Sequence, residues 1–154
     1  MISARFKERQ ARAKKIVAYL KKAYPAPETE LHYKTPMQLV AAVMLSAQTT
    51  DKQVNTVTGR GLFKKYKSAD DFARADYATF DREIGSVSFH HNKARAIIAT
   101  AKKIRDDFGG KVPKTERELI ALPGIAYKTA HVILGELHGI WEGIPTATHV
   151  KRFA

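Results

Sequence analysis

A lysine that follows a proline-glycine turn is the residue whose position in this sequence best suits chemistry. The turn has the sequence LPGIA (122–126), and Lys128 comes two residues after it. Because Pro123 stops one helix and Gly124 permits a sharp turn, we expect a second helix to begin directly afterwards. The positive end of that helix disfavours an ammonium group and favours the neutral amine of Lys128, which is the nucleophilic form.

The same turn predicts a place where a phosphate can approach the main chain. Small residues at Gly124 and Ala126 leave the first N–H groups of the second helix open to an anion. Any helical hairpin with a Pro-Gly turn shares this pattern, and the chain holds 27 Lys and Arg residues, of which Lys128 is one. The assignment therefore depends on where Lys128 lies relative to other motifs.

The charge of the chain points to a polyanionic partner. The 154 residues include 27 Lys and Arg against 15 Asp and Glu, a formal net charge of +12 and a pI of about 10.0. Such an excess suits nucleic acid, although proteins that never bind DNA also carry it. Cysteine is absent, which excludes disulfides, cysteine-ligated zinc and a cysteine-held cluster within these residues. The histidines, including His90 and His91, lack paired metal-ligand spacing, so no metal site is expected.

No segment resembles a targeting or membrane-spanning sequence. The first ten residues, MISARFKERQ, lack the apolar run of a signal peptide. No stretch approaches the roughly 18 apolar residues needed to cross a bilayer. We therefore expect a monomer in the cytoplasm, associated with the nucleoid, with no membrane partner.

Helical periodicity along the chain predicts an all-α fold. A basic amphipathic helix is expected over residues 4–24, either solvated with one thin packed stripe or in direct contact with DNA. Thr35 and Pro36 begin a helix that is apolar on almost every face, which makes it the expected buried centre. No segment alternates with the strand period for long enough to predict a sheet.

Shorter helices are expected in the middle of the chain. Asp51 is expected to cap one helix, and Ser68 and Asp76 to begin two more. A longer helix over 92–108 has an isoleucine-rich face opposite a face of lysines and arginines that includes Lys93. These elements would surround the apolar central helix.

A helical hairpin is expected near the end of the chain. Thr115 and Glu118 form a capping-box pattern for a short helix that reaches Leu122. A second helix starts after Gly124 and runs to about Leu137. The LPGIA turn joins the two.

Four motifs in one order resemble those of the endonuclease III family of helix-hairpin-helix DNA glycosylases. In chain order they are MLSAQTTD (44–51), FHHNKA (89–94), LPGIAYKTA (122–130) and IPTATHVKR (144–152). The resemblance extends from about residue 30 to the end of the chain. It supplies the context that the turn and its lysine lack in isolation.

The resemblance implies a base-excision enzyme that extrudes a nucleotide from duplex DNA. Lys128 matches the family's nucleophile, whose amine attacks the sugar C1′ as the base leaves and gives a Schiff base that collapses by β-elimination. Gln48 matches the residue that fills the gap left by the flipped base, and Phe89 the apolar wedge against the opposite strand. The other implied DNA-binding residues are Leu122, Pro123, Gly124, Ile125, Ala126 and Thr129, and the implied pocket residues are Ser46, Asp51 and His149.

One departure from the family concerns a carboxylate. The family has a catalytic aspartate at the position of Ala147, and alanine offers neither charge nor proton. Loss of a positioned acid–base group typically costs about 10²–10⁴ in rate. Asp51 is a candidate substitute on chain position alone.

The second departure concerns length. The resemblance implies a six-helix barrel domain at 25–138, with the helix-hairpin-helix at 115–137. It assigns 1–24 to the N-terminal helix of the family's second domain and 139–154 to the start of its C-terminal part. The iron–sulfur domain would be largely absent, with the ligands of the 4Fe-4S cluster beyond residue 154, so no cofactor is expected in this chain. A fragment, a split or decayed gene and an engineered piece all fit this length.

The expected function is that of a DNA glycosylase and abasic-site (AP) lyase acting on damaged, oxidised pyrimidines in double-stranded DNA. An alternative is a catalytically inactive helix-hairpin-helix module that binds DNA through charge and the hairpin, and a non-functional remnant is a third. Lesion choice would depend on the pocket rather than on these four motifs. Strand cleavage at an abasic site separates the enzyme from the binding module.

Overall fold

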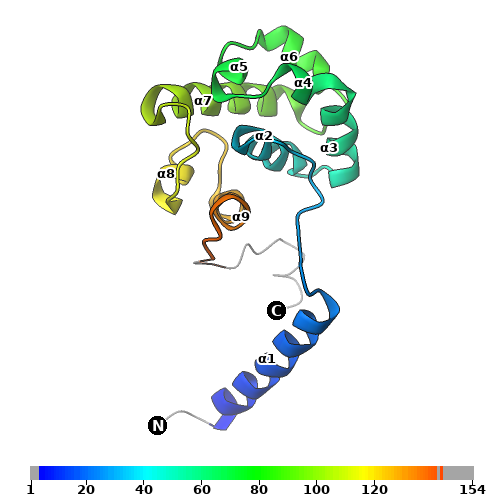
Figure 1. Ribbon diagram of the computed structural model, residues 1–154, viewed down its shortest axis with the longest axis vertical. Helices are drawn as coiled ribbons and strands as arrows, with labels where there is room; N and C mark the ends of the chain where they lie inside the picture. The colour runs from blue at the N-terminus through cyan, green and yellow to red at the C-terminus, as the bar shows by residue number, and fades with distance from the viewer. Residues whose placement is uncertain (1–3, 142, 144–154) are drawn as a thin grey trace.

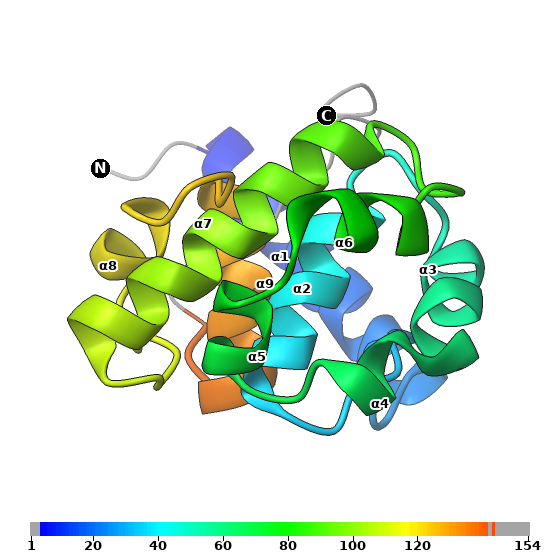
Figure 2. The same ribbon diagram turned by 90° about the horizontal axis from the view of Figure 1, so that it is seen from above.

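The structure is a computed structural model that describes residues 4–141 and residue 143. These residues form helices and connecting loops without a strand, which confirms the all-α prediction (Figures 1 and 2). None of the helices in this part of the chain is long and apolar enough to span a membrane. In chain order the elements are α1 (Ala4–Ala23), α2 (Pro36–Ser46), α3 (Asp51–Val57), η1 (Thr58–Leu62), α4 (Phe63–Lys65), α5 (Ala69–Ala73), α6 (Tyr77–Glu83), α7 (His90–Phe108), α8 (Glu116–Ile120) and α9 (Tyr127–His138).

Helix α2 is the centre of the fold, as its apolar sequence predicts. Every residue from 37 to 45 is buried, and the helix packs against α3, α7 and α9. It begins where expected, because the Thr35 side chain accepts a hydrogen bond from the Gln38 N–H and proline occupies the first helical position. Figure 2 shows α2 enclosed by the surrounding helices.

The start of α3 differs by one residue from the prediction. Thr50, not Asp51, caps this helix, since the Thr50 hydroxyl accepts the Gln53 N–H at 3.3 Å. Asp51 is the first helical residue, where its negative charge suits the positive helix end. The helix then passes into the π-helical turn η1, in which Gly61 has a φ of 125° and introduces a kink.

Helices α5 and α6 begin at the two caps that the sequence predicts. Ser68 forms a capping box with Asp71, and the Asp76 carboxylate accepts the Thr79 N–H. Phe72 on α5 and Phe80 on α6 are fully buried and meet at 5.9 Å between ring centroids, edge to face. The two short helices therefore contribute a shared aromatic cluster, and α5 lies along α7.

Helix α7 is the longest helix of the packed region and starts two residues earlier than predicted. Its N-terminal neighbour is Phe89 and its C-terminal cap is Gly109, both with left-handed backbone. Lys93, expected on the basic face, is instead buried, with 9% of its surface exposed. Burial is possible because its amine donates hydrogen bonds to acceptors in the last turn of α2 and in the segment that follows it.

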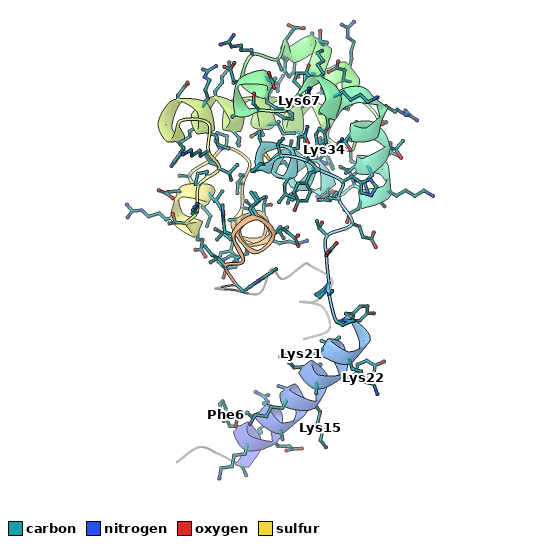
Figure 3. The ribbon with its side chains drawn as sticks, in the orientation of Figure 1. Phe6, Lys15, Lys21, Lys22, Lys34 and Lys67 are labelled. Atoms are coloured by element: carbon teal, nitrogen blue, oxygen red, sulfur yellow. The ribbon has the colours of Figure 1, made fainter. Side chains whose placement is uncertain are left out.

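Helix α1 forms as predicted and lies apart from the packed helices (Figure 1). No residue of α1 is buried, and its apolar residues Ile16 and Leu20 remain 52% and 47% exposed. Figure 3 shows Lys15, Lys21 and Lys22 on this helix, away from the remaining elements. The helix therefore adds positive charge to the chain without adding to its core.

Candidate nucleic-acid interface

The turn between α8 and α9 is shaped by Gly124. Its φ of +76° is left-handed, and a Cβ built on it would lie 2.8 Å from Ala96 Cβ and 3.1 Å from Met44 Cε. Backbone conformation and space thus both require glycine, as the sequence predicts. The absence of a side chain lets the turn lie directly on α2 and α7.

Two further contacts fix the hairpin to the core. Leu122 and Ile125 are 2% and 5% exposed, and the Thr100 hydroxyl of α7 donates to the Pro123 carbonyl at 2.6 Å. The side chains of Leu122 and Ile125 lie in the core. These two residues can therefore offer only main-chain groups to a ligand. The hairpin is thus anchored to the core at Leu122 and Ile125, while Pro123, Gly124 and Ala126 are exposed.

The first turn of α9 offers main-chain N–H groups to an anion. Its N-cap is Ala126, which has extended backbone and supplies no side-chain hydrogen bond. No acidic residue lies in this turn, and Tyr127 and Lys128 are both exposed. The N–H groups and the positive end of a 12-residue helix therefore face outward at the turn.

Lys128 lines a pocket of about 320 Å³ between α9 and the loop that joins α2 to α3. Five of the residues singled out in the sequence meet there, although they come from segments some 80 positions apart. Among the described residues, the lining consists of Thr29, Leu31, Val43, Ser46, Ala47, Gln48, Asp51, Lys128, Thr129 and Val132. The structure thus brings Lys128 together with Ser46, Gln48, Asp51 and Thr129.

The pocket combines an amine with a carboxylate. Among its described lining residues, Asp51 alone is acidic and Lys128 alone is basic. Asp51 lies at the first position of α3 and is partly buried, so its carboxylate is held at the pocket by the helix rather than by a flexible loop. An amine and a carboxylate able to accept a proton thus line one cavity.

Gln48 and Phe89 are the two non-glycine residues with left-handed backbone in the described part of the chain. Their φ angles are 55° and 57°. This conformation costs a residue with a Cβ roughly 1–2 kcal/mol and is often found at functional sites. Both side chains are exposed, Phe89 by 63%, so Phe89 is not a core aromatic.

Phe89 lies outside the Lys128 pocket. It lines a separate open hollow of about 610 Å³, next to the start of α7, with Tyr77, Asp81, His91, Asn92 and Arg95. The predicted wedge and the predicted nucleophile therefore belong to different surface features. Only Gln48 of the two expected stack-filling residues is part of the Lys128 pocket.

A histidine pair beside Phe89 was expected only as exposed or DNA-facing imidazoles. His90 Nδ1 and His91 Nδ1 lie 2.7 and 2.8 Å from the two carboxylate oxygens of Asp81. Burial raises the pKa of the Asp81 carboxyl, but the hydrogen bonds with His90 and His91 outweigh it and hold the pKa below its ordinary value. The ligating atoms of the three residues lie within 4.8 Å of one another, a proximity that sequence spacing did not indicate because Asp81 lies on α6.

Lys93 is a buried residue next to the Gln48 segment whose location the sequence interpretation did not predict. Its Nζ donates to carbonyls in the segment that carries Gln48, and burial lowers the pKa of its amine below the usual range. Its spacing of four from Ile97 and eleven from Ile104 puts it on the buried face of α7. That spacing was the available signal, and the charge of the side chain obscured it.

Two predicted site residues, Ala147 and His149, lie outside the described residues. The family's 4Fe-4S cluster does not fit the residues of this chain, because none of the 154 is a cysteine.

Comparison with protein families places most of the chain in one group. Residues 41–154 match the model of the HhH-GPD superfamily base excision DNA repair protein. Endonuclease III of Synechocystis sp. is 43% identical over 146 residues, 95% of this chain, and that of Bacillus subtilis is 41% identical over 129 residues, 84% of it. Endonuclease III of Escherichia coli K12 is 33% identical over 143 residues, 93% of the chain. The chain spans 66%, 58% and 67% of the lengths of these three relatives.

Solved structures agree with the sequence comparison. A non-covalent endonuclease III–DNA complex has a TM-score of 0.85 and 35% identity, covering 93% of this chain and 66% of its own. A trapped covalent endonuclease III–DNA intermediate has a TM-score of 0.85 and 34% identity with the same coverage. A thermostable thymine-DNA glycosylase, 20% identical with a TM-score of 0.76, shares the fold.

Proposed function

Because this chain belongs to the endonuclease III family of the HhH-GPD superfamily of base excision DNA repair proteins, we propose that it is a DNA glycosylase and AP lyase acting on damaged, oxidised pyrimidines in duplex DNA. The observation that carries the proposal is the pocket shared by Lys128, Asp51 and Gln48. Two solved endonuclease III structures that are similar to this chain are complexes with DNA, which supports duplex DNA as the partner.

Lys128 is the proposed nucleophile. Its amine attacks the sugar C1′ of an extruded nucleotide, the bond from C1′ to the base breaks, and the base leaves with the electron pair of that bond. Ring opening then gives an iminium between the lysine nitrogen and C1′. Loss of a proton from C2′ expels the 3′ phosphate and cleaves the strand by β-elimination.

Asp51 is the proposed proton acceptor for the ammonium group of Lys128. Its carboxylate lines the same pocket, and Asp51 is the one acidic residue among the described lining residues. We assign to it the role of the aspartate that the family has at the position of Ala147. A carboxylate there also stabilises positive charge that develops on the sugar as the base leaves. On a pre-formed abasic site the amine meets an open-chain aldehyde, so this step depends less on the carboxylate.

The hairpin and the two left-handed residues are the proposed means of holding DNA. The outward-facing N–H groups at the start of α9 would bind a backbone phosphate, which positions the duplex without reading its sequence. Gln48 would fill the gap left by the extruded nucleotide, and Phe89 would wedge the opposite strand. Their exposure and their fixed backbone support these roles.

Borohydride trapping on abasic duplex DNA tests the proposal. Reduction of the imine between Lys128 and C1′ should give a covalent protein–DNA adduct with the wild-type chain and none with Lys128→Ala. Lys64→Ala, which removes an exposed lysine on α4, is the matched control and should form the adduct as the wild type does. Mass analysis of the adduct should place the DNA fragment on Lys128.

The competing binding module gives a different result. Salt-sensitive retention of duplex DNA without an adduct, or an adduct unchanged in Lys128→Ala, contradicts the proposed enzyme. Retention alone would then assign the chain as a helix-hairpin-helix DNA-binding protein.

A further inference from the structure

Lys93 places its ammonium group inside the loop between α2 and α3. Its Nζ donates to the Leu45 carbonyl at 2.7 Å, the Ala47 carbonyl at 2.6 Å and the Thr49 hydroxyl at 3.2 Å. An ammonium has three N–H donors, so all of them are used within one short segment. The residue itself is only 9% exposed.

These three acceptors bracket Gln48. Leu45 lies in the last turn of α2, and Ala47 is the residue that ends this helix, so both carbonyls lack an intrahelical partner. The negative end of the α2 dipole further favours a cation at this point. The Lys93 amine thus caps the C-terminal end of α2. It also holds the residues on either side of Gln48, which has left-handed backbone.

The main chain of Lys93 is hydrogen-bonded to Phe89. The Lys93 N–H donates to the Phe89 carbonyl at 3.1 Å, in the first turn of α7. Phe89 also has left-handed backbone and is exposed. Lys93 therefore links the Phe89 segment, through its main chain, to the Gln48 segment, through its amine.

We propose that Lys93 is a positioning residue that holds the Gln48 turn against the start of α7, so that Gln48 and Phe89 are presented to duplex DNA at a fixed separation. The proposal rests on the proposed function, because it assumes that these two side chains enter the base stack. Lys93 is enclosed and does not line the Lys128 pocket. It acts through Gln48 and not on the reacting atoms.

Removal of the amine should release the turn while leaving the pocket chemistry in place. Lys93→Met keeps the length and apolar stem of the side chain but leaves the Leu45 and Ala47 carbonyls without their donor. The Gln48 turn is then free to leave its left-handed conformation. Insertion into the stack becomes less probable, whereas Lys128 on α9 is untouched.

The test measures stack insertion separately from catalysis. A duplex carries a tetrahydrofuran abasic analogue, which cannot form an imine, with 2-aminopurine in the opposite strand. Wild-type binding should raise the fluorescence because the opposite base is unstacked. At saturating protein, Lys93→Met should give a rise smaller by at least half, with unchanged response from Lys102→Met, which alters an exposed lysine on the same helix.

Kinetics on abasic DNA supply the second readout. In the borohydride assay, Lys93→Met should lower the adduct rate on duplex by roughly ten- to a hundredfold, as expected for a misplaced binding group. On single-stranded abasic DNA, which has no opposite strand to displace, the rate should equal that of the wild type. Lys128→Ala should form no adduct on either DNA.

A double mutant tests whether Lys93 acts through Gln48. If it does, Lys93→Met should add little to the defect of Gln48→Ala, since the positioned side chain is already missing. Equal losses on duplex and single strand, a full fluorescence rise in Lys93→Met, or additive defects in the double mutant would each overturn the proposal. If the wild type forms no adduct, the proposed enzyme activity is wrong. The fluorescence assay then still tests whether Lys93 positions Gln48.

Chemical rescue guards against a folding defect. Because the chain has no cysteine, Lys93→Cys introduces a single thiol that 2-bromoethylamine alkylates in denaturant, with bromide as the leaving group. The product has the length and ammonium group of lysine. After refolding it should regain the fluorescence rise, with unalkylated Lys93→Cys as the comparison, and no regain despite a cooperative melt would count against a role of the amine.

Discussion

At the scale of the residue, Lys128 and Asp51 illustrate how distant parts of the sequence can supply one proposed reactive pair. Lys128 is carried by the first turn of α9 and Asp51 by the first turn of α3, and both line the same pocket. Each helix start holds its residue in a defined direction. The pair therefore depends on how α3 and α9 pack on α2 more than on local sequence.

Asp51→Asn tests the carboxylate with almost no change of shape. Base removal from duplex DNA should slow by about 10²–10⁴, because the amide cannot take the proton from Lys128. Trapping on a pre-formed abasic site should fall less, since that step starts from an aldehyde. Single-turnover rates on a damaged-base duplex and on an abasic duplex measure the two effects, and equal losses on both would contradict the assigned role.

The sequence supplied candidate site residues where a motif fixes their place in the chain. The motifs led to Lys128 and Gln48, which the structure places in one pocket, and to Phe89, which it places in a separate hollow. Lys93 lies within one of these motifs and its spacing from Ile97 and Ile104 indicated burial, but the charge of its side chain obscured that signal. The contact of Asp81 with two histidines could not be predicted, because it depends on packing between α6 and α7, which a single sequence does not express.

At the scale of the element, helix starts determine how the interface is presented. Ser68 and Asp76 were predicted as caps and serve as caps, because neither has another suitable side chain directly next to it. Thr50 and Asp51 are adjacent and both suited, so the sequence could not distinguish them. The Thr50 hydroxyl takes the cap position, which leaves the Asp51 carboxylate available to the pocket.

A capping side chain at the start of α9 should raise the stability of the fold and weaken DNA binding. Ala126→Asp supplies a side-chain acceptor for the free N–H groups and a favourable charge, which should raise the free energy of unfolding by about 1 kcal/mol. The same carboxylate competes with and repels a phosphate. Thermal denaturation together with DNA titration measures both effects, and a gain in stability with unchanged affinity would show that the phosphate binds elsewhere.

The capping box of α5 should make this region sensitive to acid. Main-chain N–H groups of Lys67 and Ser68 donate to the Asp71 carboxylate and hold its pKa below the ordinary value of 3.8. A lowered folded-state pKa means that the carboxylate stabilises the fold above its ordinary pKa and loses this contribution as the pH falls through the folded-state value. Asp71→Ala should cost about 1 kcal/mol near pH 7.

That difference should shrink as the pH falls below about 5 and Asp71 is protonated in the parent chain. Urea denaturation of both proteins across this range provides the measurement. Ser68→Ala removes the other half of the capping box without removing a titrating group, so its cost should stay nearly constant with pH. A constant cost for Asp71→Ala as well would argue against the ionised cap.

At the scale of the whole molecule, charge and packing divide the chain into two parts. The packed helices around α2 form the helix-hairpin-helix glycosylase fold, whereas α1 adds lysines and an exposed apolar stripe (Figures 1 and 3). The all-α fold and its apolar centre were predictable from periodicity. The course of the loops that bring α3, α7 and α9 together was not, because it depends on packing between distant segments.

A net charge of +12 should make DNA binding strongly dependent on salt. If about five phosphates are neutralised, the logarithm of the association constant should fall against the logarithm of salt concentration with a slope of about −4.5. Fluorescence anisotropy with an abasic-analogue duplex between about 50 and 200 mM salt measures this slope. A slope near zero would show that charge has little part in binding.

The left-handed backbone of Gln48 and Phe89 has a consequence for how this protein would change under selection. Glycine or asparagine tolerates that conformation better, so a laboratory evolution experiment that rewards heat resistance alone should replace both residues. If Gln48 and Phe89 enter the base stack as proposed, a population evolved in that way would gain stability and lose that contact with DNA. Retention of the two side chains would then indicate selection for DNA binding and not for stability alone.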